Sequence, residues 1–348
     1  MKAYVLEAVK RLEYKNTEVP KLKKGEVLVE VQAAGICGSD IPRIFTTGTY
    51  HFPTIPGHEF SGKVIGAFDE EGRDWIGKRV GIFPLIPCKE CDCCKEEKYE
   101  MCSNYNYLGS RCDGGFAEYV AVPIWNLIEL PEAVSYEEAA MLEPASVSIH
   151  ALRRLNLEDV STVALFGLGT IGILIAQWLY SFGIKTVFAT GHNEEHGKLM
   201  QKVTSSSYHY MDSRKENVLE EILRQTSGKG VDAVIDCVGS SESLTDALNI
   251  VKPAGQILVV ANPKGDLDLD KNVYWRIMRR QICLTGTWNS SFTHSDQDDW
   301  HTVLKACEEG KLHLKELITH DLPFDQLHKG LEIMRSGKEY RNKVMIHK

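Results

Sequence analysis

Four cysteines form the densest group of potential metal ligands in the sequence. Cys88, Cys91, Cys94 and Cys102 follow the spacing C-x2-C-x2-C-x7-C. A two-residue spacer lets neighbouring thiolates reach one ion, and four thiolates complete a tetrahedral zinc site without an open position. The N-terminus lacks the long apolar core of a secretory signal, so metal binding is favoured over disulfides. We therefore predict a structural zinc site, with Cys93 as an alternative ligand.

A glycine-rich turn offers a phosphate-binding element. Gly167, Leu168, Gly169, Thr170, Ile171 and Gly172 spell G-x-G-x-x-G between an apolar strand-like segment and a helical one. In that context the first glycine makes a tight turn, the second admits a pyrophosphate, and the third lets the helix pack closely on the strand. The helix N-terminus supplies N–H donors to the phosphates. We expect this turn to bind NAD or NADP.

The choice between these two cofactors depends on the end of the next strand. A carboxylate there would bind the ribose hydroxyls of NAD. The predicted strand 186–189 is instead followed by Thr190, Gly191, His192 and Asn193. The missing acid and the small Gly191 leave room for a 2′-phosphate, to which His192 could donate. These features slightly favour NADP over NAD. Alternatively, His192 is an exposed loop histidine that does not contact the cofactor.

A second possible metal site combines Cys37 with His58. Cys37 lies in the segment 35–40 and His58 in Gly57-His58-Glu59, 21 residues further on. A thiolate and an imidazole are both zinc ligands. The spacing alone leaves open that each is an ordinary cysteine or histidine.

The elements around these groups change character near residue 145. Before it, the chain is rich in turns and short strands, among them 25–31, 78–82 and 115–122. After it, strands alternate with helices, a pattern typical of βαβ units and a parallel sheet. The predicted strands are 161–166, 186–189, 231–238 and 256–261, and the helices are 171–182, 194–202 and 215–226. A helix at 300–309 and a strand at 343–346 close the chain.

Composition excludes several classes of protein. The 348 residues include 40 Lys and Arg against 48 Asp and Glu, a net charge of −8. Without a surplus of basic side chains, neither a nucleic-acid coat nor an anionic membrane is an expected partner. The uncharged stretch 160–184 contains four glycines, so a strand, a turn and a buried helix explain it better than a membrane span. We expect a cytoplasmic protein.

In their order along the chain, these motifs resemble the zinc-dependent medium-chain dehydrogenase/reductase superfamily and, within it, the polyol dehydrogenases. The resemblance covers essentially the whole chain and includes 113–119 and Glu143-Pro144; segments 41–45, 107–111 and 286–288 carry the closer match. It implies an α/β fold with a GroES-like β-barrel catalytic domain, residues 1–145 and 286–348. A Rossmann domain with a doubly wound parallel sheet, residues 146–285, would be inserted in it, and the active site would lie in the cleft.

The resemblance also implies residue roles. Cys37, His58 and Glu143 would hold a catalytic zinc, with the fourth position open to substrate. Ser39 would pass a proton outward, and Glu59 would be a second acid beside the metal. Pro42 stands where many relatives have the histidine that ends the proton relay, so the terminal acceptor stays open.

The implied reaction is oxidation of galactitol 1-phosphate to tagatose 6-phosphate, with hydride transfer to NAD or NADP. The phosphate needs a cation, for which Arg43 and Arg111 are candidates, although each could be a plain surface arginine. Tyr50 and Trp288 would line the substrate pocket. Members of the superfamily are usually homodimers or homotetramers.

Three other functions remain as alternatives. A dehydrogenase of free polyols such as sorbitol or xylitol is the alternative in the same class. A non-catalytic nucleotide-binding protein is disfavoured because Cys37, His58 and Glu143 are all present. A zinc-dependent nucleic-acid binder is disfavoured by the acidic charge and by the single, unsplit cysteine cluster.

Overall fold

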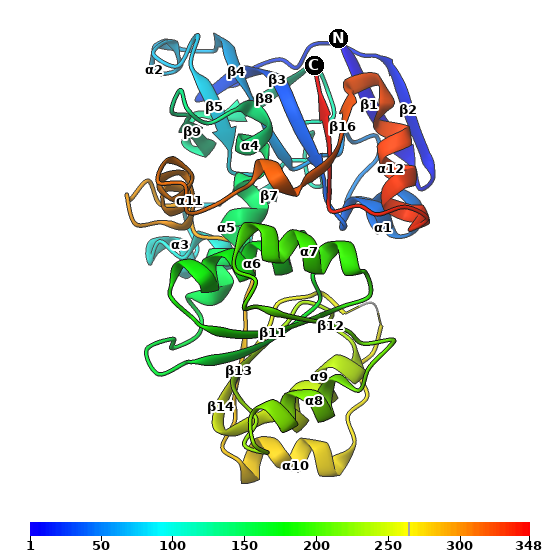
Figure 1. Ribbon diagram of the computed structural model, residues 1–348. Helices are drawn as coiled ribbons and strands as arrows, with labels where there is room; N and C mark the ends of the chain where they lie inside the picture. The colour runs from blue at the N-terminus through cyan, green and yellow to red at the C-terminus, as the bar shows by residue number, and fades with distance from the viewer. Residues whose placement is uncertain (264) are drawn as a thin grey trace. The chain divides into compact units, whose positions relative to one another are not determined.

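The chain forms two compact units, each with its own sheet and core. A computed structural model describes residues 1–263 and 265–348. The first unit comprises Met1–Pro144, Ser291–Gly310 and Leu314–Lys348, and the second comprises Ala145–Ser290 and Lys311–His313. Both chain termini belong to the first unit (Figure 1).

The second unit is built on a parallel sheet. Within the described residues it has six strands in the order β12-β11-β10-β13-β14-β15, and every neighbouring pair is parallel. Their bounds are β10 Thr162–Phe166, β11 Thr186–Gly191, β12 His209–Asp212, β13 Val231–Asp236, β14 Val251–Val259 and β15 Cys283–Gly286. Counted along the chain from β10, this is the doubly wound order 3-2-1-4-5-6. The strand order reverses between β10 and β13, where such sheets bind dinucleotides.

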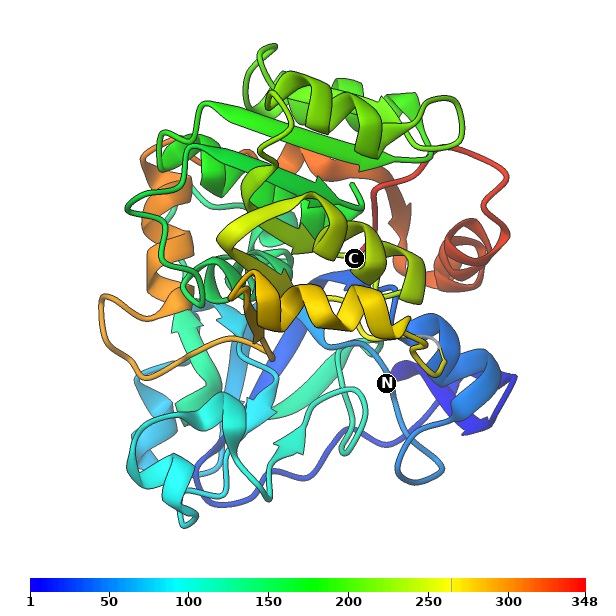
Figure 2. The same cartoon turned by 90° about the horizontal axis from the view of Figure 1, so that it is seen from below.

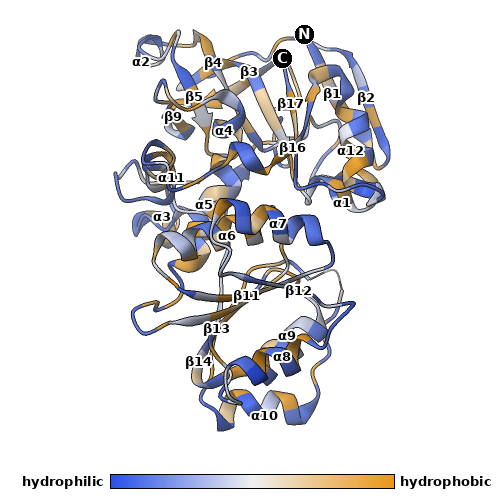
Figure 3. Ribbon diagram, in the orientation of Figure 1, coloured by the Kyte–Doolittle hydropathy of each residue, from blue (hydrophilic) through white to orange (hydrophobic). Residues whose placement is uncertain are grey.

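Helices cover both faces of this sheet. α6 (Thr170–Ser181) and α7 (Glu194–Val203) lie on one face, and α8 (Val218–Gln225), α9 (Ser241–Ile250) and α10 (Lys271–Arg279) lie on the other (Figure 1). Hydrophobic and hydrophilic residues alternate along α8 and α10, as expected of helices with one face on a sheet (Figure 3). The sequence predicted α6, α7 and α8, and it did not identify α9 or α10.

The uncharged stretch near residue 170 is a buried strand, turn and helix. β10 is buried at four of its five positions, and most of α6 is buried as well. A central strand covered on both faces is apolar throughout, which explains the run without charges. No helix in the described parts of the chain is long and apolar enough to cross a membrane.

The first unit is dominated by antiparallel pairing around one long strand. In the described residues, β3 (Glu26–Ile36) pairs with β4 (Glu59–Ala67), β8 (Tyr119–Pro123) and β17 (Lys343–His347). The sheet path is β16-β17-β3-β4-β5-β9. The remaining strands are β1 Lys2–Ala8, β2 Arg11–Asn16, β5 Arg79–Ile82, β6 Leu85–Ile86, β7 Asn106–Tyr107, β9 Leu127–Glu129 and β16 Ile318–Pro323.

Helices of 3 to 11 residues connect these strands, and the last of them before β10, α5, continues into the second unit. They are α1 Asp40–Pro42, η1 Arg43–Thr47, α2 Glu70–Arg73, α3 Asp92–Lys95, η2 Tyr99–Met101, η3 Ile124–Asn126, α4 Tyr136–Ala140, α5 Leu142–Leu152, α11 Asp299–Glu308, η4 Lys315–Leu317, η5 Phe324–Gln326 and α12 Leu327–Ser336. The register of β3 matters most for function. Gly35 pairs with Glu59 of β4 on one side and with Met345 of β17 on the other. Segments far apart in sequence therefore meet where β3 ends, just before Cys37.

Candidate functional site

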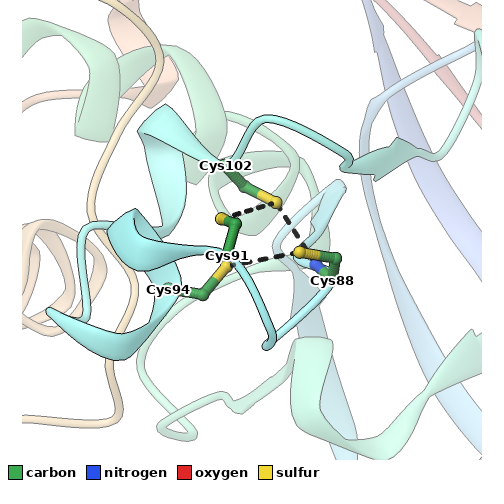
Figure 4. A group of neighbouring side chains, drawn as sticks. All are labelled: Cys88, Cys91, Cys94 and Cys102. Carbon is green, nitrogen blue, oxygen red and sulfur yellow. Dashed lines mark hydrogen bonds between the residues drawn. The ribbon is translucent and has the colours of Figure 1, made fainter.

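The four predicted cysteines come together in one lobe of the first unit. The Sγ atoms of Cys88, Cys91, Cys94 and Cys102 all lie within 4.8 Å of one another (Figure 4). All four thiols are free, and Cys94 and Cys102 are buried. The backbone N–H groups of Ser103 and Cys94 lower the pKa of Cys91 to about 6, which favours a thiolate at neutral pH. A closed set of four sulfur donors fits a structural zinc ion.

The second group of potential ligands lies at the end of β3. Cys37, His58 and Glu59 each offer a ligand atom within 4.8 Å of the others. His58 and Glu59 are buried, and Cys37 is half-buried. The Nδ1 atom of His58 is buried without a hydrogen-bond partner. A thiol, an imidazole and a carboxylate in one place fit a zinc ion.

A buried carboxylate positions this group. The Asp40 side chain is fully buried; Oδ2 accepts a hydrogen bond from the Cys37 backbone N–H at 3.0 Å. Oδ1 lies 2.9 Å from Nη1 of Arg43 and 3.5 Å from Nδ1 of His58. Burial opposes ionisation of Asp40, but the neighbouring His58 and Arg43 outweigh it and lower its pKa. Arg43 therefore already has an anionic partner inside the protein, which weakens its case as the phosphate-binding cation.

Glu59 is paired with Lys343, a residue that the sequence patterns did not predict to be part of the site. Nζ of Lys343, on β17, lies 2.5 Å from Oε2 of Glu59, and both side chains are buried. Burial opposes protonation of Lys343, but Glu59 outweighs it and raises the pKa of the lysine. No spacing rule could have found this pair, since 284 residues separate the two positions. The register of β17 on β3 is what joins them.

Glu143 lies next to this group rather than in its tight cluster. Its Oε1 accepts a hydrogen bond of 3.1 Å from the hydroxyl of Tyr107, a second residue not singled out by its chemistry. The Tyr107 ring is 5.9 Å from the ring of His58. Burial raises the pKa of the Glu143 carboxyl. Among the described residues, the acid grouped most closely with Cys37 and His58 is therefore Glu59, and Glu143 is held by Tyr107.

Ser39 lies beside the same group. Its hydroxyl donates to Sγ of Cys37 at 3.3 Å. The residue directly precedes α1 and is half-buried. This contact places Ser39 next to the candidate ligand Cys37. The role of Ser39 in proton transfer stays a prediction.

The glycine turn of the second unit has the geometry of a dinucleotide-binding turn. Gly167 has a φ of +90°, and a Cβ on Gly172 would lie 2.0 Å from the Gly167 carbonyl oxygen. Only glycine fits either position. Gly169, by contrast, has no heavy atom within 4 Å of its would-be Cβ and directly precedes α6. This open space at a helix N-terminus suits a phosphate group.

A cavity of about 400 Å³ lies at the end of β11. Its lining combines His192 and Asn193 with acids and bases from two elements: Glu194, Glu195, Asp212, Arg214 and Lys215. Gly191 does not open space on its Cβ side, because that direction meets the Tyr210 ring at 3.3 Å. Gly191 was predicted to leave room for a 2′-phosphate. In the structure the open space is lined by His192, Arg214 and Lys215 instead.

The remaining predicted substrate residues fall in different units. Tyr50 and Arg111 belong to the first unit and contact each other, with the Arg111 guanidinium 4.2 Å from the Tyr50 ring. Trp288 belongs to the second unit and is half exposed. Of the four candidate substrate residues, Arg43, Tyr50, Arg111 and Trp288, the structure brings Tyr50 and Arg111 into contact.

Comparison with known proteins identifies the class. Residues 23–132 match the alcohol dehydrogenase GroES-like domain, and residues 170–309 match the zinc-binding dehydrogenase family. The chain belongs to the zinc-binding alcohol and polyol dehydrogenase family. The predicted fold, a GroES-like domain combined with a Rossmann-type parallel sheet, is confirmed, as is the expectation of an NAD(P)- and zinc-dependent enzyme class.

Individual relatives are polyol dehydrogenases. The chain is 30% identical to galactitol 1-phosphate 5-dehydrogenase of Escherichia coli over 88% of each chain. It is similar to the crystal structure of that organism's galactitol-1-phosphate dehydrogenase with a TM-score of 0.88, covering 100% of both chains. It is also 29% identical to sorbitol dehydrogenase of Bacillus subtilis, over 100% of this chain and 97% of the relative. A zinc-binding dehydrogenase from Sinorhizobium meliloti, crystallised with NADP, matches with a TM-score of 0.90 and 25% identity over 100% of this chain and 99% of that one.

Proposed function

We propose that this enzyme oxidises a secondary alcohol of a polyol phosphate, galactitol 1-phosphate to tagatose 6-phosphate, with NAD or NADP as hydride acceptor. The observation that carries the proposal is the convergence of Cys37, His58 and Glu59 at the end of β3. Three donors of these types suit a catalytic zinc site, which keeps one position open for a substrate oxygen. The substrate itself is proposed from similarity to relatives, which act on both phosphorylated and free polyols.

We assign the catalytic zinc to Cys37, His58 and one or both of Glu59 and Glu143, and the structural zinc to Cys88, Cys91, Cys94 and Cys102. Bound zinc would act as a Lewis acid that lowers the pKa of a substrate hydroxyl. Asp40 orients Cys37 through its backbone N–H, and its Oδ1 faces Nδ1 of His58. Lys343 holds the Glu59 carboxylate, and Tyr107 holds that of Glu143. Ser39, whose hydroxyl lies beside Sγ of Cys37, would receive and pass on the substrate proton.

We propose that the turn from Gly167 to Gly172 binds the cofactor pyrophosphate and that the cavity lined by His192, just after Gly191, receives the adenosine ribose. No carboxylate follows directly at the end of β11, and Arg214 and Lys215 line the cavity. Both features favour NADP. Glu194 and Asp212 offset them, because they already pair with Lys215 and Arg214. The preference for NADP over NAD is therefore expected to be small.

The test is cofactor reduction by zinc-loaded enzyme on galactitol 1-phosphate, galactitol and sorbitol, each with NAD+ and NADP+. A kcat/KM that is highest for the phosphate ester supports the proposal. Equal or higher values for the free polyols would replace it with the alternative, a general polyol dehydrogenase. Absence of reduction with every pair would contradict both.

We also propose that the protein is a homo-oligomer that associates through β15 and α10. In the described residues β15 pairs only with β14, and three of its four residues are exposed. No residue of α10 is buried, and Tyr274 and Met278 are more than half exposed; the helix lies at the front of the unit in Figure 2. An open strand edge beside exposed apolar side chains is an association site. A two-fold axis would pair two copies of β15 antiparallel, which makes a second copy the fitting partner.

A further inference from the structure

Arg111 is held between two tyrosine rings in the first unit. Its guanidinium carbon lies 4.2 Å from the centre of the Tyr50 ring and 4.3 Å from that of Tyr105. Both rings contact the guanidinium at cation–π distance without using its N–H donors. Nη1 donates to the Tyr105 carbonyl at 3.2 Å, and Nε is buried without a partner.

Within the described part of the chain, the charge of Arg111 has no counter-ion. Among the described residues no carboxylate lies within ion-pair distance of it, and its electrostatic neighbours are Tyr50 and Tyr105. Arg43, the other candidate, is bound to the buried Asp40. An arginine remains charged at all relevant pH values. A partly buried guanidinium with an unused edge is therefore suited to an oxyanion that comes from outside.

The loop that carries Arg111 also carries a residue of the candidate metal site. The backbone N–H of Arg111 donates to the Tyr107 carbonyl at 2.9 Å, and the Tyr107 hydroxyl bonds to Glu143. The rings of Tyr105 and Tyr107 are 6.2 Å apart. The arginine and the ligand group therefore lie at two ends of one short, bonded loop. A polyol whose hydroxyl meets the metal could place a charged group several carbons away near Arg111.

We infer that Arg111, clamped by Tyr50 and Tyr105, binds a terminal oxyanion of the substrate and thereby selects charged polyol derivatives over free polyols. This inference rests on the proposed dehydrogenase function and specifies its substrate class. The guanidinium fork suits a phosphate ester or a carboxylate, which both present paired oxygens. Tyr50 is 69% exposed and would contribute by holding the guanidinium plane.

The experiment compares kcat and KM of wild type, Arg111→Gln, Arg111→Lys and Tyr50→Leu on a polyol phosphate, a hexonate and a free polyol. We expect Arg111→Gln to raise KM for the charged substrates by about 10- to 100-fold, the loss of one charge-assisted hydrogen-bond pair. The free polyol should change by less than about threefold, since uncharged ends gain little from a cation. Arg111→Lys should recover part of the loss. The control is Arg73→Gln, an exposed arginine paired with Glu70, which should leave every value unchanged.

The hexonate and the polyol phosphate distinguish a carboxylate from a phosphate as the natural oxyanion. The substrate whose KM rises more in Arg111→Gln carries the natural group. If Arg111→Gln lowers kcat/KM equally for charged and free substrates, the inference is overturned. Arg111 would then only stabilise its loop. If wild type oxidises no polyol, the proposed function fails, and the inference is judged by binding alone. In that case wild type should gain thermal stability with polyol phosphate, and Arg111→Gln should not. If polyol phosphate does not raise the thermal stability of wild type, the inference is overturned as well.

Discussion

The buried ammonium group of Lys343 donates a hydrogen bond to Glu59, and the two side chains are only 3% and 1% exposed. One comes from the last strand of the chain and the other from the start of β4. The pair lies directly beside Cys37, because Gly35 is the register partner of both strands. A lysine near the C-terminus thus controls an acid of the candidate catalytic centre.

Removing this lysine should be costly. Lys343→Met leaves the Glu59 carboxylate buried and unpaired, which lowers the free energy of unfolding by about 3–5 kcal/mol. Denaturant unfolding of the zinc-free protein measures the loss. The double variant Lys343→Met/Glu59→Gln removes both charges and should recover most of it. A double variant as unstable as the single one would show that the lysine acts through packing alone.

The cysteine lobe offers a test with a matched neighbour. Cys94→Ser removes one of the four clustered thiols and should abolish metal binding at that site, lowering stability by at least about 2 kcal/mol. Cys93 is adjacent but lies outside the cluster, so Cys93→Ser should retain metal and stability. Zinc content and thermal unfolding of both variants decide the matter. Metal loss in Cys93→Ser would make that residue a ligand.

Asp232 should make the second unit sensitive to acid. Its Oδ2 accepts hydrogen bonds from the backbone N–H groups and hydroxyls of Ser161 and Thr162, at 2.8–2.9 Å, and Oδ1 pairs with Lys252. Burial opposes ionisation, but Lys252 and these donors outweigh it and lower the pKa of Asp232 far below its ordinary value.

Because the folded pKa is depressed, the stabilisation is complete above the unfolded pKa of about 4 and is lost as pH falls below it. Asp232→Asn should cost about 2 kcal/mol at pH 7, and the difference from wild type should shrink in acid. Urea unfolding at several pH values measures this. Asp159→Asn, at an exposed position of the same unit, should follow the wild-type profile. A constant difference at all pH values would contradict the assignment.

The exposed edge of the second unit should govern the oligomeric state. Leu284→Arg places a charge on the open strand β15 and should convert the oligomer to monomers at micromolar concentration. Light scattering after size exclusion reports the mass. Phe68→Arg, at an exposed apolar residue of the first unit, should leave the mass unchanged. A monomeric wild type, or an oligomer that survives Leu284→Arg, would exclude this interface.

Local patterns made much of the molecule predictable. The predicted strand at 161–166 and helix at 171–182 correspond to β10 and α6 within a residue. The turn between them needs glycine at Gly167 because of its φ of +90°, and at Gly172 because the Gly167 carbonyl oxygen leaves no room for a Cβ. α10 was not predicted; none of its residues is fully buried, and its core face is made by the partly buried Val273 and Ile277.

The sequence by itself determined the family, from the order of motifs along the whole chain. It also determined the glycine turn and the four-thiol cluster, since each depends on residues close together in the chain. Only the tertiary structure decided how the second metal-ligand group is completed. The pairing of β3 with β4 and β17 brings Lys343 to Glu59, and β7, which ends at Tyr107, brings that hydroxyl to Glu143. The two contacts join residues 284 and 36 positions apart and depend on strand register and burial, which no local spacing encodes.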